Sequence, residues 1–148
     1  MMGVLCTIGY ERASLEGFIA ALKAAGVATL VDVRDRPWSQ RPHFRRDELR
    51  KILLDAGLGY VHIRALGNPE EGRAAAHAGD MESYRRFMDD RLASPDGQKG
   101  LARAMELSRK GPICVMCYER DPAHCHRSRV ADALVALGLN PPRHLFAE

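Results

Sequence analysis

Side chains that can do chemistry are concentrated in one short segment of the chain, from Cys117 to Arg129. The segment contains two cysteines, two histidines, a glutamate, an aspartate and three arginines. Cysteine and histidine act as nucleophiles, acid–base groups and metal ligands, and arginine binds phosphate and carboxylate groups. Apolar runs on both sides predict that the segment joins a buried strand to a helix. Three kinds of site are compatible with these residues.

The first hypothesis is an anion site. The helical pattern that begins near His126 would point free backbone N–H groups and the positive end of its dipole at the preceding loop. Arg127 and Ser128 open that helix, and Arg34 could approach from an earlier strand. A phosphate or a carboxylate would suit this place. The competing interpretation is a structural network in which these arginines pair with neighbouring carboxylates.

The second hypothesis is a reactive or redox-active cysteine. Cys125 lies at the predicted helix start beside His126, where the pKa of a thiol is lowered and the thiolate is favoured. Cys117 closes the preceding strand, so either thiol could attack a substrate and the other could resolve the product as a disulfide. His126 would then serve as an acid–base group. The alternative is a pair of inert, packed thiols.

The third hypothesis is a metal site. Cys117, Cys125 and His126 are ligand types for zinc or iron, and Glu119 and His124 are further candidates. Structural zinc sites usually combine two pairs of closely spaced ligands, whereas this chain has one cluster. Adjacent ligands such as Cys125 and His126 can hold one ion only where the backbone is irregular.

The elements that would position these residues are indicated by hydrophobic patterning. Helices are predicted between Ser14 and Gly26, between Asp47 and Gly57, and over 81–93, 98–109 and 127–137. A loose connection is predicted for 64–79 and a turn for 94–97. Short apolar or alternating runs predict strands at 4–8, 29–33, 58–63, 113–116 and 143–146.

Alternating strands and helices predict a single α/β domain over residues 1–148, a three-layer sandwich with a mainly parallel sheet of about five strands. Right-handed crossovers place the carboxyl ends of parallel strands at one edge of the sheet, where ligands bind. Three polar segments would therefore meet in one crevice. They are Gly9–Glu11, Asp32–Arg34 and the segment from Cys117. Glu11 and Glu119 would add carboxylates, one of which could act as an acid and the other as a base. Asp32 has three possible roles: it would orient Arg34, act as a base, or simply form an ion pair with Arg34.

A second basic segment, residues 34–46, contains five arginines together with Trp38 and Phe44. Arginines interleaved with aromatic residues can hold phosphates and stack on bases, which suggests a nucleic-acid-binding surface. The alternative is a partly ordered lid whose aromatic residues pack on the body of the protein. The formal net charge of +3 is only mildly basic and does not by itself favour nucleic acid.

Length and composition are those of an ordinary globular domain, with 148 residues of which 46% are hydrophobic. Two of the four cysteines, Cys6 and Cys114, lie within apolar runs, so a cytoplasmic and mostly reduced protein is expected. No signal peptide is predicted at the start. Because no apolar run approaches about 20 residues, no membrane partner is expected. The sequence leaves the oligomeric state open.

Several short motifs together resemble the family called domain of unknown function 488. The resemblance spans nearly the whole chain, and it implies the fold and the site while carrying no settled activity. The motifs are Thr7–Glu11, Val31–Arg34, Pro37 with Ser39, Pro42 and Phe44, Tyr60 with His62, Leu66–Gly67, Met116–Glu119 and Cys125–Arg127.

Carried over by this resemblance, the family's polar positions fall on Tyr10, Glu11, Asp32, Arg34, Cys117, Glu119, Cys125, His126 and Arg127. The chain departs from the family pattern at Asn68 and at His43. A weaker resemblance, at the level of topology, is to rhodanese-like domains, which share an Asp-Val-Arg strand end and a cysteine closing a later strand. Their cysteine loop is shorter, so their tight anion cradle is not implied here.

These observations favour a small cytosolic enzyme that acts on an anionic, phosphate- or carboxylate-bearing small molecule. The floor of the predicted site is formed by Cys117, Cys125, His126 and Arg127, with Tyr10, Glu11, Asp32, Arg34, Glu119 and Ser128 around it. Two alternatives remain open. One is a nucleic-acid-associated module that uses residues 34–46, and the other is a metal-binding protein with ligands Cys117, Cys125 and His126.

Overall fold

The computed structural model describes residues 3–148, except for the side chain of His124. Within that range, one sheet has five strands in the order β3-β2-β4-β1-β5, and every pair of neighbours is parallel. The predicted parallel sheet is thereby confirmed. The strands are β1 (Leu5–Gly9), β2 (Thr29–Asp32), β3 (Gly59–His62), β4 (Ile113–Cys117) and β5 (Arg143–Phe146).

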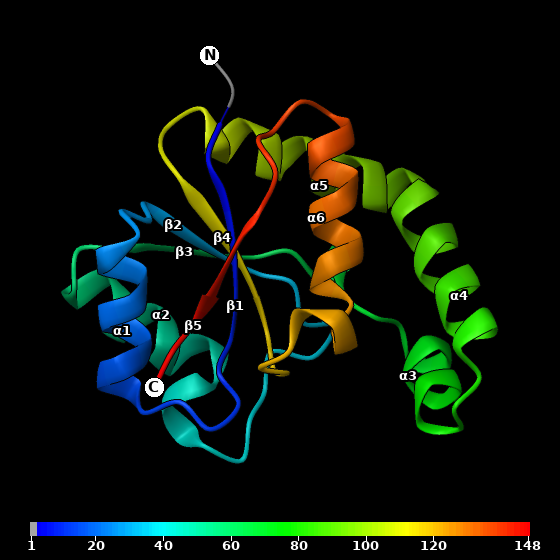
Figure 1. Ribbon diagram of the computed structural model, residues 1–148, viewed down its shortest axis with the longest axis horizontal. Coiled ribbons are helices and arrows are strands. Elements are labelled where there is room, and N and C mark those ends of the chain that lie inside the picture. Colours follow the sequence, from blue (N-terminus) through cyan, green and yellow to red (C-terminus); the bar gives the residue numbers. More distant parts are fainter. Residues whose placement is uncertain (1–2) are drawn as a thin grey trace.

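Helices cover both faces of this sheet, as a three-layer α/β sandwich requires (Figure 1). One face packs on α1 (Leu15–Ala24) and α2 (Arg46–Asp55). The other packs on α4 (Met81–Ala93), α5 (Pro95–Ser108) and α6 (Arg127–Ala136). The remaining elements of the described chain are α3 (Glu70–His77) and the short 3-10 helices η1 (Pro42–Phe44), η2 (Arg64–Leu66) and η3 (Pro122–His124).

The central strand β4 is apolar throughout because both of its sides are covered. Successive side chains of a strand point to opposite faces. Ile113, Val115 and Cys117 therefore join the core beneath α5 and α6, whereas Cys114 and Met116 join the core beneath α1 and α2. This alternation directs the last side chain of β4, that of Cys117, toward the face on which α6 lies.

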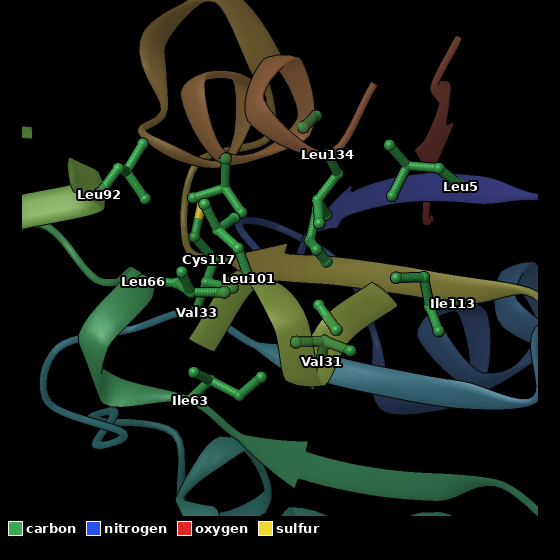
Figure 2. Packing of buried hydrophobic residues seen from close by; sticks show 14 of the residues in the cluster. Leu5, Val31, Val33, Ile63, Leu66, Leu92, Leu101, Ile113, Cys117 and Leu134 are labelled. Carbon is green, nitrogen blue, oxygen red and sulfur yellow. The ribbon is translucent and has the colours of Figure 1, made fainter. Parts of the chain in front are cut away.

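Figure 2 shows the α5–α6 side of the sheet, where Val33, Leu101 and Leu134 belong to one buried cluster. Cys117 belongs to the same cluster, at the carboxyl end of its strand. Its sulfur is thus held by a well-packed core instead of a mobile loop. A rigid support of this kind keeps a functional side chain in a fixed position.

The path of the chain explains where a crevice can form. The connections from β1 to β2 and from β2 to β3 run over one face with α1 and α2, and those from β3 to β4 and from β4 to β5 return over the other. The central strand β4 lies between β1 and β2, whose following helices cover the opposite face to α6. Loops that leave neighbouring strands toward opposite faces open a crevice between them.

Two local predictions were wrong. Residues 64–79 are not a loose connection, because they contain η2 and α3. The turn predicted for 94–97 is instead the start of α5, where Ser94 accepts a hydrogen bond from the backbone N–H of Gly97 at 3.1 Å and Pro95 occupies the first turn. Pro and Gly after Ser are typical both of turns and of helix starts, so composition alone did not separate the two.

The helix predicted after Ser14 is α1, and Ser14 is its N-cap, since the Ser14 hydroxyl accepts from the backbone N–H of Gly17 at 2.9 Å. The strand predicted at 143–146 is β5. Among residues 3–148, no helix has the length and apolar character needed to cross a membrane.

Candidate functional site

A cleft of about 550 Å³ lies at the carboxyl end of β4. Its lining comes from the ends of β1, β2 and β4, from the loop that follows β2, from the start of α6, and from α3 and the residues just before it. The predicted meeting of three distant segments therefore occurs. The lining residues are Tyr10, Arg34, Asp35, Arg36, Trp38, Ser39, Gln40, Arg41, Asn68, Arg73, Cys117, Tyr118, Glu119 and His126.

Cys117 lines this cleft, and its sulfur is joined in a disulfide to that of the buried Cys125. Cys117 is the last residue of β4, and Cys125 lies in extended backbone just before α6. Their Cα atoms are 7.2 Å apart. The backbone N–H of Arg127, at the first turn of α6, donates to Cys125 Sγ at 3.4 Å. The helix N-terminus is thus directed at a sulfur, which favours negative charge there.

His126 is oriented by one short hydrogen bond. Its Nε2 lies 2.6 Å from the carbonyl oxygen of Val33, and because a carbonyl can only accept, Nε2 carries the proton. Burial lowers the pKa of His126, although the contact with Val33 opposes that effect, so the ring is neutral near pH 7. The lone pair is consequently on Nδ1, which lies 3.9 Å from Cys125 Sγ.

The two sulfurs and one imidazole nitrogen form a compact cluster. The ligand atoms of Cys117, Cys125 and His126 all lie within 4.8 Å of one another. Glu119 adds a carboxylate oxygen 3.4 Å from Cys117 Sγ. The further candidate ligand His124 has its side chain outside the described part of the chain. Two soft sulfur ligands and an imidazole are a donor set suited to zinc.

Arg127 lies behind the sulfurs, away from the open cleft. The side chain is fully buried, and its Nη1 donates to Cys117 Sγ at 3.3 Å and to the backbone oxygen of Glu119. Nη2 donates to the backbone oxygen of Arg120 at 3.1 Å. Burial lowers the pKa of Arg127. The lining of the cleft, among the residues described, does not include this arginine, so its expected role as a direct anion ligand has no geometric support.

Asp32 and Arg34 form a buried, two-pronged ion pair. Arg34 Nε donates to Asp32 Oδ1 at 2.8 Å, and Nη2 donates to Oδ2 at 2.6 Å. The hydroxyl of Tyr60 donates to the same Oδ2 at 2.5 Å. Arg34 Nη1 donates to the backbone oxygen of Phe44 at 2.8 Å and to the hydroxyl of Tyr10 at 3.3 Å. This geometry favours the ion-pair interpretation, in which the two side chains hold the loop after β2.

Two predicted site residues lie elsewhere. Glu11 accepts a hydrogen bond from the backbone N–H of Arg120 at 3.0 Å and lines a separate pocket with Phe146. Ser128 donates its hydroxyl proton to the backbone oxygen of Pro122. Both side chains fasten the loop between β4 and α6, because each contacts the backbone of that loop.

The arginines around Asp35 were missed by reasoning from the sequence. Asp35 accepts from Arg73 at 2.8 Å, Arg91 at 2.9 Å and Arg64 at 3.3 Å. Burial alone would raise the pKa of Asp35, but the hydrogen bonds from these three arginines outweigh it and lower the pKa to about 2. The arginines come from α3, α4 and η2, two of which were not predicted as elements.

Positive charge predominates in the cleft. The lining contains the arginines 34, 36, 41 and 73 and the carboxylates of Asp35 and Glu119. Arg36 is exposed, whereas Arg41 donates to the backbone oxygens of Tyr10 and Ala13. Arg34 is paired with Asp32 behind the lining, so four arginines stand against the carboxylates of Asp32, Asp35 and Glu119, and the remaining excess of positive charge attracts negative ligands.

Comparison with known proteins identifies the family of this chain. Neither the curated proteins nor the solved structures include a significant match to this chain. One family model matches residues 14–134, which contain β2, β3, β4 and the cysteine–histidine cluster. The chain therefore belongs to the family described as Domain of unknown function DUF488.

Proposed function

We propose that the protein is an enzyme that binds an anionic small molecule, carrying phosphate or carboxylate, in the cleft at the end of β4. Its chemistry would take place at the cluster of Cys117, Cys125 and His126. The observation that carries this proposal is that one cleft of about 550 Å³ is lined both by Cys117 and His126 and by an excess of arginines. Small-molecule sites are typically clefts of about 300–1,000 Å³ with a few polar groups that converge.

The arrangement supports distinct roles for His126 and Arg127 beside the two cysteines. Nδ1 of neutral His126 is placed to accept a proton from a reduced Cys125. The guanidinium of Arg127 contacts Cys117 Sγ and so stabilises a thiolate there. Both roles require the reduced state of the pair. A cytosolic location, where thiols are kept reduced, is part of the proposal for this reason.

Thermal unfolding in the presence of inorganic phosphate or citrate tests the anion site. Binding to the folded state raises the melting temperature, by several degrees once the anion is well above its Kd. The variant Arg36→Ala removes an exposed cation of the cleft and should reduce the shift. Arg50→Ala removes an exposed arginine of α2 that lies outside the cleft lining, and it should leave the shift unchanged. No shift with either anion would contradict the proposal.

A nucleic-acid-binding module is the second candidate. Trp38 is 57% exposed at the mouth of the cleft, and the guanidinium of Arg45 lies 5.1 Å from the centre of its ring. An exposed aromatic beside arginines can stack on unpaired bases. A mobility-shift assay with single-stranded DNA and RNA at low salt tests this candidate, because electrostatic binding is strongest there. Binding that Trp38→Ala abolishes would favour it, and no retardation at low salt would eliminate it.

A further inference from the structure

We propose that Cys117, Cys125 and His126 form a Zn²⁺ site whose fourth coordination position opens into the cleft. This zinc site adds a metal to the proposed anion-binding cleft. Only the identity of its fourth ligand, an anionic group of the bound molecule, rests on the proposed function. Three protein ligands with one open position are the arrangement of catalytic zinc, whereas structural zinc is closed by four protein ligands.

The ligand atoms are gathered closely enough for one ion to reach all three once the disulfide is reduced. Zinc binds thiolate sulfur at about 2.3 Å and imidazole nitrogen at about 2.0–2.1 Å, so a sulfur and a nitrogen on a tetrahedral ion lie ~3.5 Å apart. Cys125 Sγ and His126 Nδ1 are 3.9 Å apart, and all three ligand atoms lie within 4.8 Å of one another. The separation of Cys125 Sγ and His126 Nδ1 is already near the ~3.5 Å of a tetrahedral ion, whereas the two sulfurs must part to ~3.8 Å after reduction.

The histidine is already oriented as a ligand. Metal-binding histidines usually donate the other ring N–H to a carboxylate or a backbone carbonyl, which fixes the tautomer. His126 does this through Nε2 and the carbonyl oxygen of Val33, at 2.6 Å. The lone pair on Nδ1 is thereby aimed at the sulfurs.

Hydrogen-bond donors next to the two sulfurs would stabilise negatively charged thiolates. The backbone N–H of Arg127 donates to Cys125 Sγ, and its guanidinium donates to Cys117 Sγ. Arg127 is fully buried, and its Nε has no hydrogen-bond partner among the described residues. A buried cation is costly unless negative charge lies close to it. The carboxylates of Glu119 and Asp121 already act on this guanidinium, and a thiolate at Cys117, 3.3 Å from Nη1, places a further negatively charged acceptor beside it, which a disulfide sulfur does not.

The backbone separation also suits an ion between the two cysteines. Their Cα atoms are 7.2 Å apart, beyond the ~4.4–6.8 Å that most disulfides span. Two thiolates on one tetrahedral ion stand ~3.8 Å apart, so the wider spacing is accommodated without moving the backbone. Two-electron reduction of the disulfide by an added dithiol, with the dithiol oxidised in turn, frees the two sulfurs for Zn²⁺.

The fourth position faces the cleft because Cys117 and His126 both line it. Water or an anionic group of a bound molecule would complete the coordination. The arginines of the same cleft would hold the rest of that molecule. The metal would then supply a Lewis acid or an activated water at the place where the substrate binds.

Titration of the dithiol-reduced, metal-free protein with Co²⁺ tests the site. One equivalent should produce a thiolate-to-cobalt charge-transfer band and the intense visible bands of tetrahedral Co²⁺, and Zn²⁺ should then abolish both, since it binds such sites more tightly. The disulfide form should produce neither band. Absence of these bands in the reduced wild-type protein overturns the proposal. Because this experiment uses the wild-type protein, its outcome does not depend on whether any variant folds.

Matched variants identify the ligands. His126→Gln keeps a nitrogen that can donate to Val33 but removes the imidazole lone pair, so the tetrahedral spectrum should be lost. His62→Gln is its control, because His62 Nε2 also lies 2.6 Å from a carbonyl oxygen, that of Arg34. Cys125→Ser should likewise lose the spectrum, whereas Cys6→Ala, which removes a buried thiol elsewhere in the core, should keep it. A spectrum unchanged in both His126→Gln and Cys125→Ser would assign the metal to other residues.

Addition of phosphate to the Co²⁺ form separates the two proposals. A shift of the visible bands supports an open position that accepts an anion. Unchanged bands alongside stabilisation by phosphate would overturn the open position and leave the anion cleft intact. Cobalt bands without any stabilisation by phosphate would support the metal site and contradict the proposed function.

Discussion

Arg127 places a positive charge directly behind the two sulfurs, where the side chain is fully buried. Its guanidinium also satisfies the backbone oxygens of Glu119 and Arg120, so it organises the loop as well as the cysteines. A charge in this position has two consequences. It favours thiolate at Cys117, and it makes the fold depend on a polar side chain inside the core.

Arg127→Met should therefore destabilise the protein by about 3 kcal/mol, because two backbone acceptors lose their partner. It should also weaken metal binding ~10–100-fold, as loss of a group that supports a ligand does. Urea unfolding and Co²⁺ titration measure the two effects. Arg129→Met is the matched control, since Arg129 forms a partly exposed pair with Asp89 and should cost less than about 1 kcal/mol. Equal effects of the two substitutions would contradict this account.

At the scale of elements, Asp35 connects the end of β2 to the helical side of the protein. The arginines that bind it lie in α3, α4 and η2, and Asp35 itself lines the cleft. The carboxylate of Asp35 thus holds the loop after β2, which lines the cleft, in a fixed position against α3, α4 and η2. Against the effect of burial, the hydrogen bonds from these arginines lower the pKa of Asp35 to about 2, which means that the charged form is bound more strongly in the folded state.

Acid should remove the contribution of Asp35 in a defined range. A carboxyl group whose pKa is lower in the folded state stabilises fully above its unfolded pKa, about 4, and loses this effect as the pH falls through its folded pKa of about 2. Asp35→Asn should be clearly less stable than the wild type at pH 7, and the gap should narrow between about pH 4 and pH 2.

Urea midpoints measured for both proteins across this range check the prediction. The control Asp47→Asn removes an acidic residue that is 84% exposed in its side chain, and it should show little difference at any pH. If the difference in stability between Asp35→Asn and the wild type did not depend on pH, the charge of Asp35 would not be what stabilises this part of the cleft.

The loop after β4 is pressed against the end of β1. Glu11 donates its backbone N–H to the oxygen of Tyr118 at 2.9 Å, and Gly9 lies opposite Cys117 in the sheet. A Cβ added to Gly9 would collide with the backbone oxygen of Glu119. The absence of a side chain at Gly9 is therefore what allows the cysteine loop to close over β1.

Gly9→Ala should displace this loop and destabilise the protein by about 1–3 kcal/mol. Because Glu119 and Cys117 move with the loop, binding of Co²⁺ should weaken as well. Thermal unfolding and Co²⁺ titration test both effects. Gly59→Ala is a suitable control at another strand, where the nearest atom to the added Cβ is the Thr29 hydroxyl oxygen at 3.1 Å. Normal cobalt affinity in Gly9→Ala would show that the close contact does not position the cluster.

At the scale of the whole molecule, the sheet and the place of the site could be predicted from the sequence. Apolar runs such as 29–33 and 113–116 separated by helical patterns indicated parallel strands, and parallel strands bring their carboxyl ends to one edge. The convergence of Tyr10, Arg34 and Cys117 follows from that rule alone. The short helix α3 could not be predicted with the same ease, because its only buried residue is Gly72 and it has no apolar stripe.

The directions in which individual side chains point could not be predicted from the sequence. Glu11 and Arg127 follow the expected strands, yet Glu11 turns into a neighbouring pocket and Arg127 turns beneath the sulfurs. The partners of Asp35 lie 29 to 56 residues away in the chain, and no local pattern connects them. Such details depend on how helices pack on the sheet, which is decided by the tertiary structure.

A crystal structure of the reduced protein grown with Zn²⁺, with anomalous scattering recorded at the zinc edge, would locate the ion. We expect an anomalous peak about 2.3 Å from the sulfurs of Cys117 and Cys125 and about 2.0–2.1 Å from Nδ1 of His126, with its fourth ligand in the cleft. A peak at other residues, or no peak beside two reduced sulfurs, would contradict the proposed zinc site.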